Sequence, residues 1–191
     1  TNSFGSMPMV MAEYNLEHKA HEITVKAAQL ARAACDKYST ADKPRFVAGS
    51  IGPTTKALSV TGGTTFAILV ENFYQIAKGL IEGGADYLLI ETAQDSRNIK
   101  AALLGIEKLE KETGEKYLVA VSGTIETMGT MLAGQNVEAF LASMLHRDLF
   151  YIGLNCATGP EFMTDHIRTL SKLSPFPIAC VPNAGLPDED G

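Results

Sequence analysis

Residues 83–92 read Gly-Gly-Ala-Asp-Tyr-Leu-Leu-Ile-Glu-Thr, and this stretch already indicates the fold class. Its two glycines end a segment whose apolar residues recur at three- and four-residue steps, the spacing of an amphipathic helix. The apolar run that follows is continuous rather than alternating, which is typical of a parallel strand covered on both faces. Glu91 and Thr92 then close the run. The stretch therefore predicts a helix, a buried parallel strand and a polar strand end, in that order.

The same order recurs along the chain. Further apolar runs predict strands at residues 46–51, 117–122, 151–155 and 178–181. Helical patterns lie at residues 66–80, 99–109 (Asp95 as N-cap, Gly114 as stop), 137–145 and 160–170, and near the start, where Ile23, Ala27, Leu30, Ala31 and Ala34 mark a packed face that includes Cys35. Such alternation predicts a parallel α/β fold, either an open doubly wound sheet or a (β/α)8 barrel. Neither a dinucleotide fingerprint nor a Walker loop supports a nucleotide-binding sheet.

Small polar or reactive groups follow the strands. They are Gly52-Pro53-Thr54, Glu91-Thr92, Ser122-Gly123-Thr124, Asn155-Cys156 and Asn183. In a barrel the carboxyl ends of all strands meet at one mouth, where active sites are built. An open sheet concentrates its site at the point where the strand order reverses. Polar groups on every strand end therefore favour the barrel.

Each of these groups has a structural interpretation beside the functional one. Thr54, Thr92 and Thr124 fit turn geometry or helix capping equally well. Glu91 is different, because a carboxylate that ends an apolar strand is unfavourable unless it is paired. It either binds a ligand or pairs with a charge in the barrel mouth. Cys156 precedes a helix start, where the local field favours the thiolate that ligates metals or attacks, although a buried structural thiol remains the alternative.

The other two cysteines are predicted to be structural. Cys180 lies three residues before Asn183, and strand alternation places the two on opposite faces. With Asn183 at the mouth, Cys180 packs toward the helix layer. Cys35 belongs to an alanine-rich helical stripe, so we expect it in the core.

Composition excludes several classes of function. The chain has 191 residues, a net charge of −6 and a pI near 5.2, with its basic residues scattered rather than clustered, which argues against nucleic acid. It contains no apolar run long enough for a membrane span and no signal peptide. Three widely separated cysteines suit a reducing cytoplasm. Because the chain begins at Thr1 rather than methionine, we expect it to be cut from a longer polypeptide.

Six segments, in order, resemble the homocysteine S-methyltransferase family. They are residues 1–5 (TNSFG), 46–54 (FVAGSIGPT), 83–92 (GGADYLLIET), 122–125 (SGTI), 153–160 (GLNCATGP) and 182–187 (PNAGLP). The resemblance covers nearly the whole chain. Within the family, the segments around Cys156 and Asn183 are most similar to the homocysteine-binding modules of cobalamin-dependent, methionine-forming enzymes. The chain is therefore identified as a member of this family.

The resemblance implies a single domain over residues 1–191, a truncated (β/α)8 TIM-type barrel. Strands two to seven of the barrel are expected to be present, the first of them ending within residues 1–5, and strands one and eight to be missing. A barrel without two strands leaves two open edges. We therefore expect the isolated chain to be inactive, to hold zinc poorly and to self-associate.

The resemblance also implies a metal centre. Family members hold zinc through three cysteine thiolates, and Cys156 matches one of them. Asn183 matches the residue that completes the resting metal shell and gives way to the substrate thiol. The family's other two ligands form an adjacent cysteine pair, which occurs nowhere in this chain. A lone thiolate and an amide cannot form a closed tetrahedral site.

The implied substrate is homocysteine. Glu91 matches the acid that binds its ammonium group, and the groups around Ser122, Thr124, Gly49 and Ser50 match the lining of the amino-acid site. Zinc would deprotonate and orient the homocysteine thiol. The thiolate would then take a methyl group from methylcobalamin to give methionine, with cobalamin and folate bound by other modules of the parent chain.

Three alternatives remain open at this stage. A cobalamin-independent relative would use betaine or S-methylmethionine as the methyl donor. A non-catalytic barrel fragment would explain the absent ligands. An unrelated barrel enzyme would need a Schiff-base lysine or a glycine-rich phosphate loop at the strand ends, and the sequence offers neither.

Overall fold

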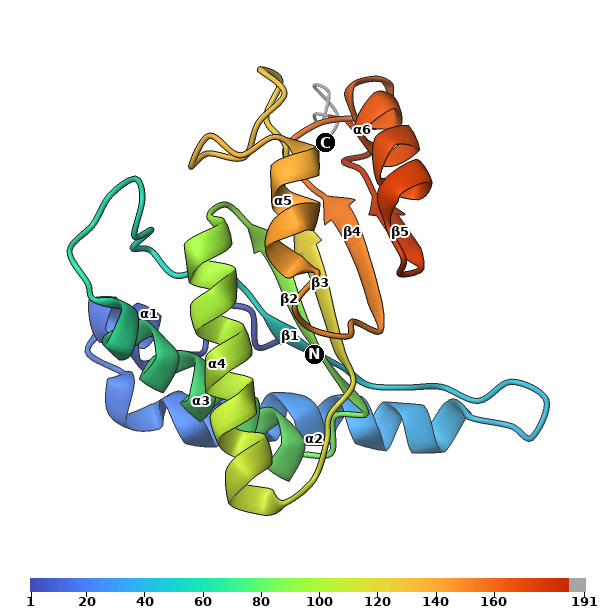
Figure 1. The fold of residues 1–191 in the computed structure, drawn as a ribbon. Coiled ribbons are helices and arrows are strands. Elements are labelled where there is room, and N and C mark those ends of the chain that lie inside the picture. Colours follow the sequence, from blue (N-terminus) through green and yellow to red (C-terminus); the bar gives the residue numbers. More distant parts are fainter. Residues whose placement is uncertain (186–191) are drawn as a thin grey trace, which may run out of the picture.

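Five parallel strands form one sheet in the computed structural model, which describes residues 1–185 (Figure 1). They are β1 (Ala48–Ile51), β2 (Tyr87–Ala93), β3 (Val119–Gly123), β4 (Tyr151–Asn155) and β5 (Ile178–Val181). Each strand pairs with the next one in the sequence, so the sheet order is β1-β2-β3-β4-β5. The order never reverses, whereas a doubly wound sheet reverses at its switch point. The predicted parallel α/β fold is confirmed, and the order is that of a partial barrel.

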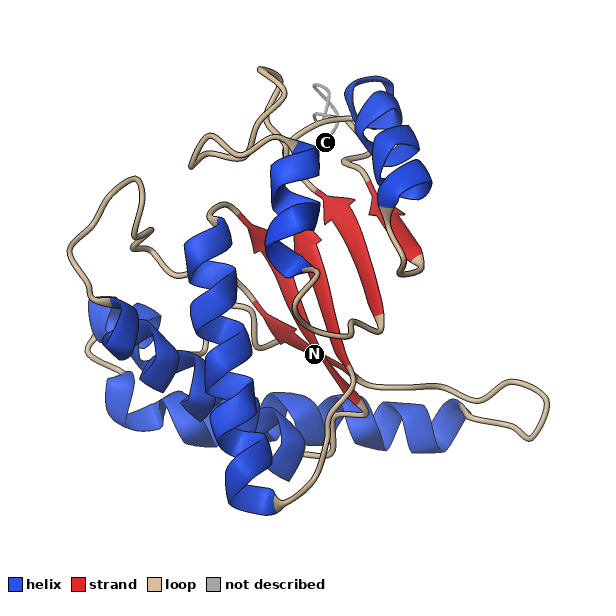
Figure 2. Cartoon of the chain, in the orientation of Figure 1, coloured by secondary structure: helices blue, strands red, loops and turns tan. Residues whose placement is uncertain are grey.

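Helices connect the strands and lie on one face of the sheet (Figure 2). They are α1 (Pro8–Met11), the 3-10 turns η1 (Ala12–Tyr14) and η2 (Glu17–Lys19), α2 (Ala20–Tyr38), α3 (Phe66–Glu82), α4 (Ser96–Thr113), α5 (Val137–Met144) and α6 (Pro160–Leu173). The predicted caps of α4 are confirmed. Asp95 accepts a hydrogen bond from the Arg97 amide, and Gly114 ends the helix with a left-handed φ of 73°.

Strand alternation defines two faces of the sheet. On β2, Leu88 and Ile90 are buried in the hydrophobic core shared with the helices. Tyr87, Leu89 and Glu91 are only partly buried and lie on the opposite side, which we call the inner face. In a barrel the inner face surrounds the axis. Glu91 is therefore the last inner-face residue of a strand anchored by its core side.

The expected strand at the N-terminus is not formed. Instead, Thr1 to Phe4 run beside β1 without strand geometry: the Thr1 ammonium donates to the Ala48 carbonyl at 2.9 Å, and the Gly52 amide donates to the Phe4 carbonyl at 3.0 Å. A Cβ added at Gly52 would lie 2.6 Å from that carbonyl oxygen, so glycine is needed for the close approach. Side-chain hydroxyls make further bonds in place of a ladder, so residues 1–185 contain five strands and not six.

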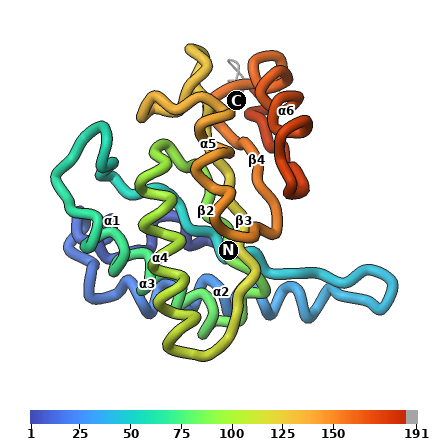
Figure 3. The backbone as a smooth tube through the Cα atoms, viewed as in Figure 1, coloured from blue at the N-terminus to red at the C-terminus, as the bar shows by residue number. Residues whose placement is uncertain are grey.

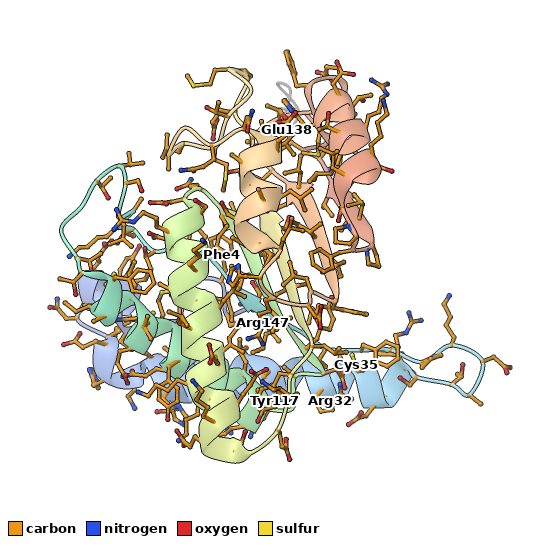
Figure 4. The ribbon with its side chains drawn as sticks, viewed as in Figure 1. Phe4, Arg32, Cys35, Tyr117, Glu138 and Arg147 are labelled. Atoms are coloured by element: carbon orange, nitrogen blue, oxygen red, sulfur yellow. The ribbon has the colours of Figure 1, made fainter. Side chains whose placement is uncertain are left out.

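The predicted packed face of α2 is correct only in part: Ala27 is buried, but the other residues predicted for that face are not. Leu30 is 74% exposed, and Cys35 is partly exposed rather than in the core (Figure 4). The helix packs through small residues, because Gly79 on α3 and Gly83 directly after α3 face it. A Cβ added at Gly83 would lie 2.5 Å from Ala28, so the two helices approach too closely for a leucine between them. Hydrophobic spacing alone therefore predicted only part of the packed face of α2.

The loops at the carboxyl ends of the strands are long, and one loop at the other end is prominent. Residues 39–47 extend away from the sheet after α2 (Figure 3). Residues 52–65 and 124–136 follow β1 and β3 at the end of the molecule toward which the strands run. Within the described part of the chain, no helix combines the length and apolarity needed to cross a membrane.

Candidate functional site

Polar side chains gather where the parallel strands end. All five strands run in one direction, so their carboxyl ends form one rim of the sheet (Figure 1). The residues at this rim are Ser50, Glu91, Thr92, Ser122, Asn155 and Cys156. Direct hydrogen bonds link several of them, between neighbouring strands and also between β2 and β4, which lie on either side of β3. The structure therefore brings together the strand ends that the sequence singled out.

Glu91 is held from one side by a hydroxyl. Ser50 Oγ on β1 donates to Glu91 Oε1 at 2.6 Å, and the contact is partly buried. Among residues 1–185, no lysine, arginine or histidine forms an ion pair with this carboxylate. A partly buried carboxylate is most stable when a positive charge approaches it. The arrangement leaves Glu91 able to receive a cationic group.

Aromatic rings lie on the inner face below Glu91. Tyr87 packs edge-on against Phe150 and Tyr151, with ring centroids 5.4 and 6.1 Å away. Burial raises the pKa of the Tyr151 hydroxyl well above its ordinary value, assisted by its contact with Tyr87 and by the negative charge of Glu91. Tyr151 therefore stays neutral. Toward the amino ends of β2 and β4 the inner face is therefore aromatic and uncharged, and Glu91 carries the charge nearer the rim.

Strand β2 bulges at Glu91 and Thr92. Ile90 pairs with Val121 and Ala93 with Gly123, so β2 uses one more residue than β3 between these pairs. Thr92 takes a left-handed φ of 56° at this point. Bulges of this kind change the direction of a side chain and are common beside active sites.

Asn155 joins the ends of β2, β3 and β4. Its Oδ1 accepts from Ser122 Oγ at 2.6 Å and from the Thr92 amide at 3.0 Å. Its Nδ2 donates to Thr92 Oγ1 at 2.8 Å. The sequence placed Asn155 at a strand end but gave it no role. Its position beside Cys156 could have drawn attention to it. Its hydrogen-bond partners, however, depend on the β2 bulge, which the sequence does not reveal.

Two predicted substrate-site residues offer no free side chain at the rim. Thr124 is buried, and both its amide and its hydroxyl donate to the Ala93 carbonyl, at 3.0 and 3.4 Å. At Gly49, an added Cβ would meet Leu80 of α3 at 3.1 Å, so this position faces the helix layer. These two residues can contribute main-chain groups, whereas Ser50 and Ser122 also offer hydroxyls.

Cys156 is exposed and follows directly after β4. It and Ala157 both have a left-handed φ of 60°. The Cys156 amide donates to the Val181 carbonyl at 3.1 Å, and the Asn183 amide donates to the Thr158 carbonyl at 3.1 Å. The exposed Asn183 therefore lies on the segment that runs beside residues 156–158. The two predicted metal ligands occupy adjacent strand ends.

Cys180 points to the helix layer, as strand alternation predicted. Its sulfur lies 3.6 Å from Met163 Sδ on α6, although the residue is exposed. No cluster of three or more histidine, cysteine, aspartate or glutamate residues with metal-binding geometry is found in residues 1–185. Zinc needs four ligands in a structural site and three protein ligands in a catalytic one. Cys156 and Asn183 can thus form only part of a zinc site.

The whole chain, residues 1–191, matches the sequence model of the homocysteine S-methyltransferase domain. It is 40% identical over 187 residues to methionine synthase of Mycobacterium leprae (strain TN), which covers 98% of this chain and 15% of that protein. Methionine synthase of Mycobacterium tuberculosis (strain ATCC 25618 / H37Rv) is 38% identical, with 98% of this chain and 16% of that protein covered. The chain therefore spans about one sixth of the length of these relatives.

The fold has matches among solved structures. The metallated form of the homocysteine methyltransferase MmuM from Escherichia coli aligns with a TM-score of 0.80 and 22% identity, over 97% of this chain and 66% of that one. Its oxidized form aligns with a TM-score of 0.75 and 23% identity, over 97% and 65%. At this identity the likeness establishes the fold alone. The family follows from the sequence, because the domain model matches all 191 residues: the chain belongs to the homocysteine S-methyltransferase family.

Proposed function

We propose that this chain is the homocysteine-binding part of a methionine-forming methyltransferase. The observation that carries the proposal is Glu91, a partly buried carboxylate fixed by Ser50 and without a cationic partner in residues 1–185. Homocysteine brings an ammonium group that would complete this pair. The carboxylate and the exposed thiol of Cys156 lie at the ends of strands of one sheet, so one amino acid with a terminal thiol could contact both.

In this proposal the substrate's amino-acid end lies over β1, β2 and β3. Glu91 accepts hydrogen bonds from the ammonium group, and Ser50 keeps the carboxylate from rotating. Main-chain groups near Gly49, Ser122 and Thr124 line the same end of the site.

We further propose that Cys156 contributes one thiolate to a zinc ion, with Asn183 as a weak resting ligand. The exposed Cys156 thiol is available for this role, and the further thiolates would come from outside residues 1–185. Zinc, when bound, lowers the pKa of a coordinated thiol and so supplies the nucleophile at neutral pH. On this view the 191-residue chain alone is inactive.

The methyl donor is proposed to be methylcobalamin, bound with folate by other modules of a longer parent chain in the cytoplasm. Support comes from the two mycobacterial methionine synthases, of which this chain covers only a small share. Betaine or S-methylmethionine would be the donor in the alternative proposal. Offering each donor to the full-length protein, with homocysteine as acceptor, separates the two.

Zinc content tests the metal assignment. We expect a full-length protein that contains this chain to bind about one zinc ion, because three protein thiolates form one site. Cys156→Ser should abolish zinc binding and methyl transfer. Cys180→Ser is the matched control, since that exposed thiol faces Met163 and not the strand-end rim. Zinc that persists in Cys156→Ser would refute this assignment.

A further inference from the structure

The direction of Glu91 depends on an unusual backbone. Glu91 is the first residue of the β2 bulge, and Thr92, the second, has a left-handed φ of 56°. A β-branched residue takes this conformation only where its surroundings enforce it. Strand alternation already places Glu91 on the inner face, but the bulge begins at this residue and changes the direction in which its side chain leaves the strand. Whatever holds Thr92 therefore also fixes the backbone directly after Glu91, and with it the angle at which the carboxylate meets Ser50.

The side chain of Asn155 holds it. The bulge interrupts the ladder between β2 and β3, and Asn155 Oδ1 accepts the Thr92 amide at 3.0 Å at that point. Asn155 Nδ2 donates to Thr92 Oγ1 at 2.8 Å, so one amide group grips both the backbone and the side chain of Thr92. Ser122 Oγ, 2.6 Å from the same Oδ1, fixes the amide in turn.

These contacts tie three strands together at the site. Asn155 is the last residue of β4, Ser122 lies on β3 and Thr92 on β2. All three bonds are partly buried, so a lost partner would leave polar groups unsatisfied. Asn155 also directly precedes Cys156, whose φ is 60°. Asn155 thus supports both the Glu91 end and the Cys156 end of the site.

We propose that Asn155 is a positioning residue for ammonium recognition: it locks the β2 bulge and thereby aims the Glu91 carboxylate. This inference rests on the proposed homocysteine function and extends it to a residue that does not itself contact the ammonium group. It gives Asn155 an effect that a general loss of stability would not produce. Removing Asn155 should weaken selection for the substrate's amino group more than it weakens binding of the rest of the substrate.

The test compares two ligands of a full-length protein that contains this chain: L-homocysteine, and 4-mercaptobutyrate, which lacks the amino group. The ratio of their dissociation constants, measured by calorimetry, reports ammonium recognition. We expect Asn155→Ala to reduce this ratio by about tenfold, the effect of one misplaced charge-assisted hydrogen bond. Asn136→Ala is the matched control, because Asn136 caps α5 through the Ala139 amide at 2.9 Å. It should lower stability and leave the ratio unchanged.

The outcomes separate the two proposals. An unmodified protein that does not prefer homocysteine would refute the proposed function, and this inference with it. A folded Asn155→Ala protein that keeps the full preference, while Glu91→Gln loses it, would overturn the inference alone. If Asn155→Ala does not fold, Thr92→Val decides, since it keeps the β-branched shape and removes only the acceptor of Nδ2. We expect a loss of about threefold there; an unchanged ratio would overturn the inference.

Discussion

Glu91 combines partial burial, one hydroxyl partner and no ion pair within residues 1–185. We expect Glu91→Gln in the full-length protein to weaken homocysteine binding by about 10- to 100-fold, the range for loss of a hydrogen bond to a charged group. Binding of 4-mercaptobutyrate should change much less, because that ligand has no ammonium group. Calorimetric titration with both compounds measures the difference.

The matched control for that prediction is Glu138→Gln. Glu138 is an exposed carboxylate in the first turn of α5 (Figure 4), so the same change of charge occurs outside the strand-end rim. Its homocysteine affinity should match that of the unmodified protein. Equal losses in both variants would mean that the overall charge, rather than the Glu91 contact, governs binding.

Single residues also show what the sequence could and could not predict. Glu91 and Cys156 stood out because a carboxylate and a thiol at the ends of apolar strands need a reason to be there. Asn155 did not, since an amide at a strand end is ordinary and its partners lie 33 and 63 positions away in the sequence. Only the register between β2 and β3 reveals its role.

At the scale of helices and strands, Glu110 connects several elements at the opposite end of the sheet. Its side chain is 2% exposed and accepts from Lys116 at 2.9 Å, from the Tyr117 amide at 3.3 Å and from Arg147 at 2.8 Å. Burial acts to raise the pKa of Glu110, but these donors outweigh it, so the pKa lies below its usual range. Glu110 therefore ties α4 to the segments that lead into β3 and β4.

We expect Glu110→Gln to lower the free energy of unfolding at neutral pH by about 3 kcal/mol, because it leaves Arg147, whose side chain is only 17% exposed, without its carboxylate partner. The sign of the pH effect follows from the lowered folded-state pKa. The stabilisation is present above the usual glutamate pKa of about 4.3 and is lost as the pH falls through the lower folded value. Acidification should therefore narrow the difference between the variant and the unmodified chain.

Urea denaturation at several pH values measures this difference. Glu107→Gln is the control, since Glu107 forms only a surface pair with Lys111 one helical turn away. It should change stability little at any pH. A gap between Glu110→Gln and the unmodified chain that stays constant down to acidic pH would contradict the assigned pKa direction.

The elements themselves were largely predictable from the sequence. The bounds of β4 and β5 match the predicted runs, and the other strands differ by one or two residues at one or both ends. Two elements were not predictable. Nothing in the sequence of residues 1–4 shows that side-chain hydroxyls would bond to the backbone of β1 in place of a regular ladder of backbone hydrogen bonds. The packed face of α2 is set by Gly79 on α3 and Gly83 directly after it, which no hydrophobic pattern within α2 could reveal.

For the molecule as a whole, the order β1-β2-β3-β4-β5 leaves the sheet with two different edges. Residues 1–4 cover the outer edge of β1 through four hydrogen bonds. Within residues 1–185 no segment pairs with the outer edge of β5, and Val181 on that strand is 63% exposed. An exposed apolar edge strand is a template for pairing with another chain.

We therefore expect the isolated 191-residue chain to self-associate through β5 as its concentration rises. Val181→Lys should shift the sedimentation profile toward the monomer, because a lysine on an edge strand opposes pairing by charge and desolvation. Leu104→Lys provides the control, since it adds the same charge at an exposed position of α4, away from either edge. If both variants reduce association equally, net charge is responsible. If only Val181→Lys does, the edge of β5 is the surface through which copies meet.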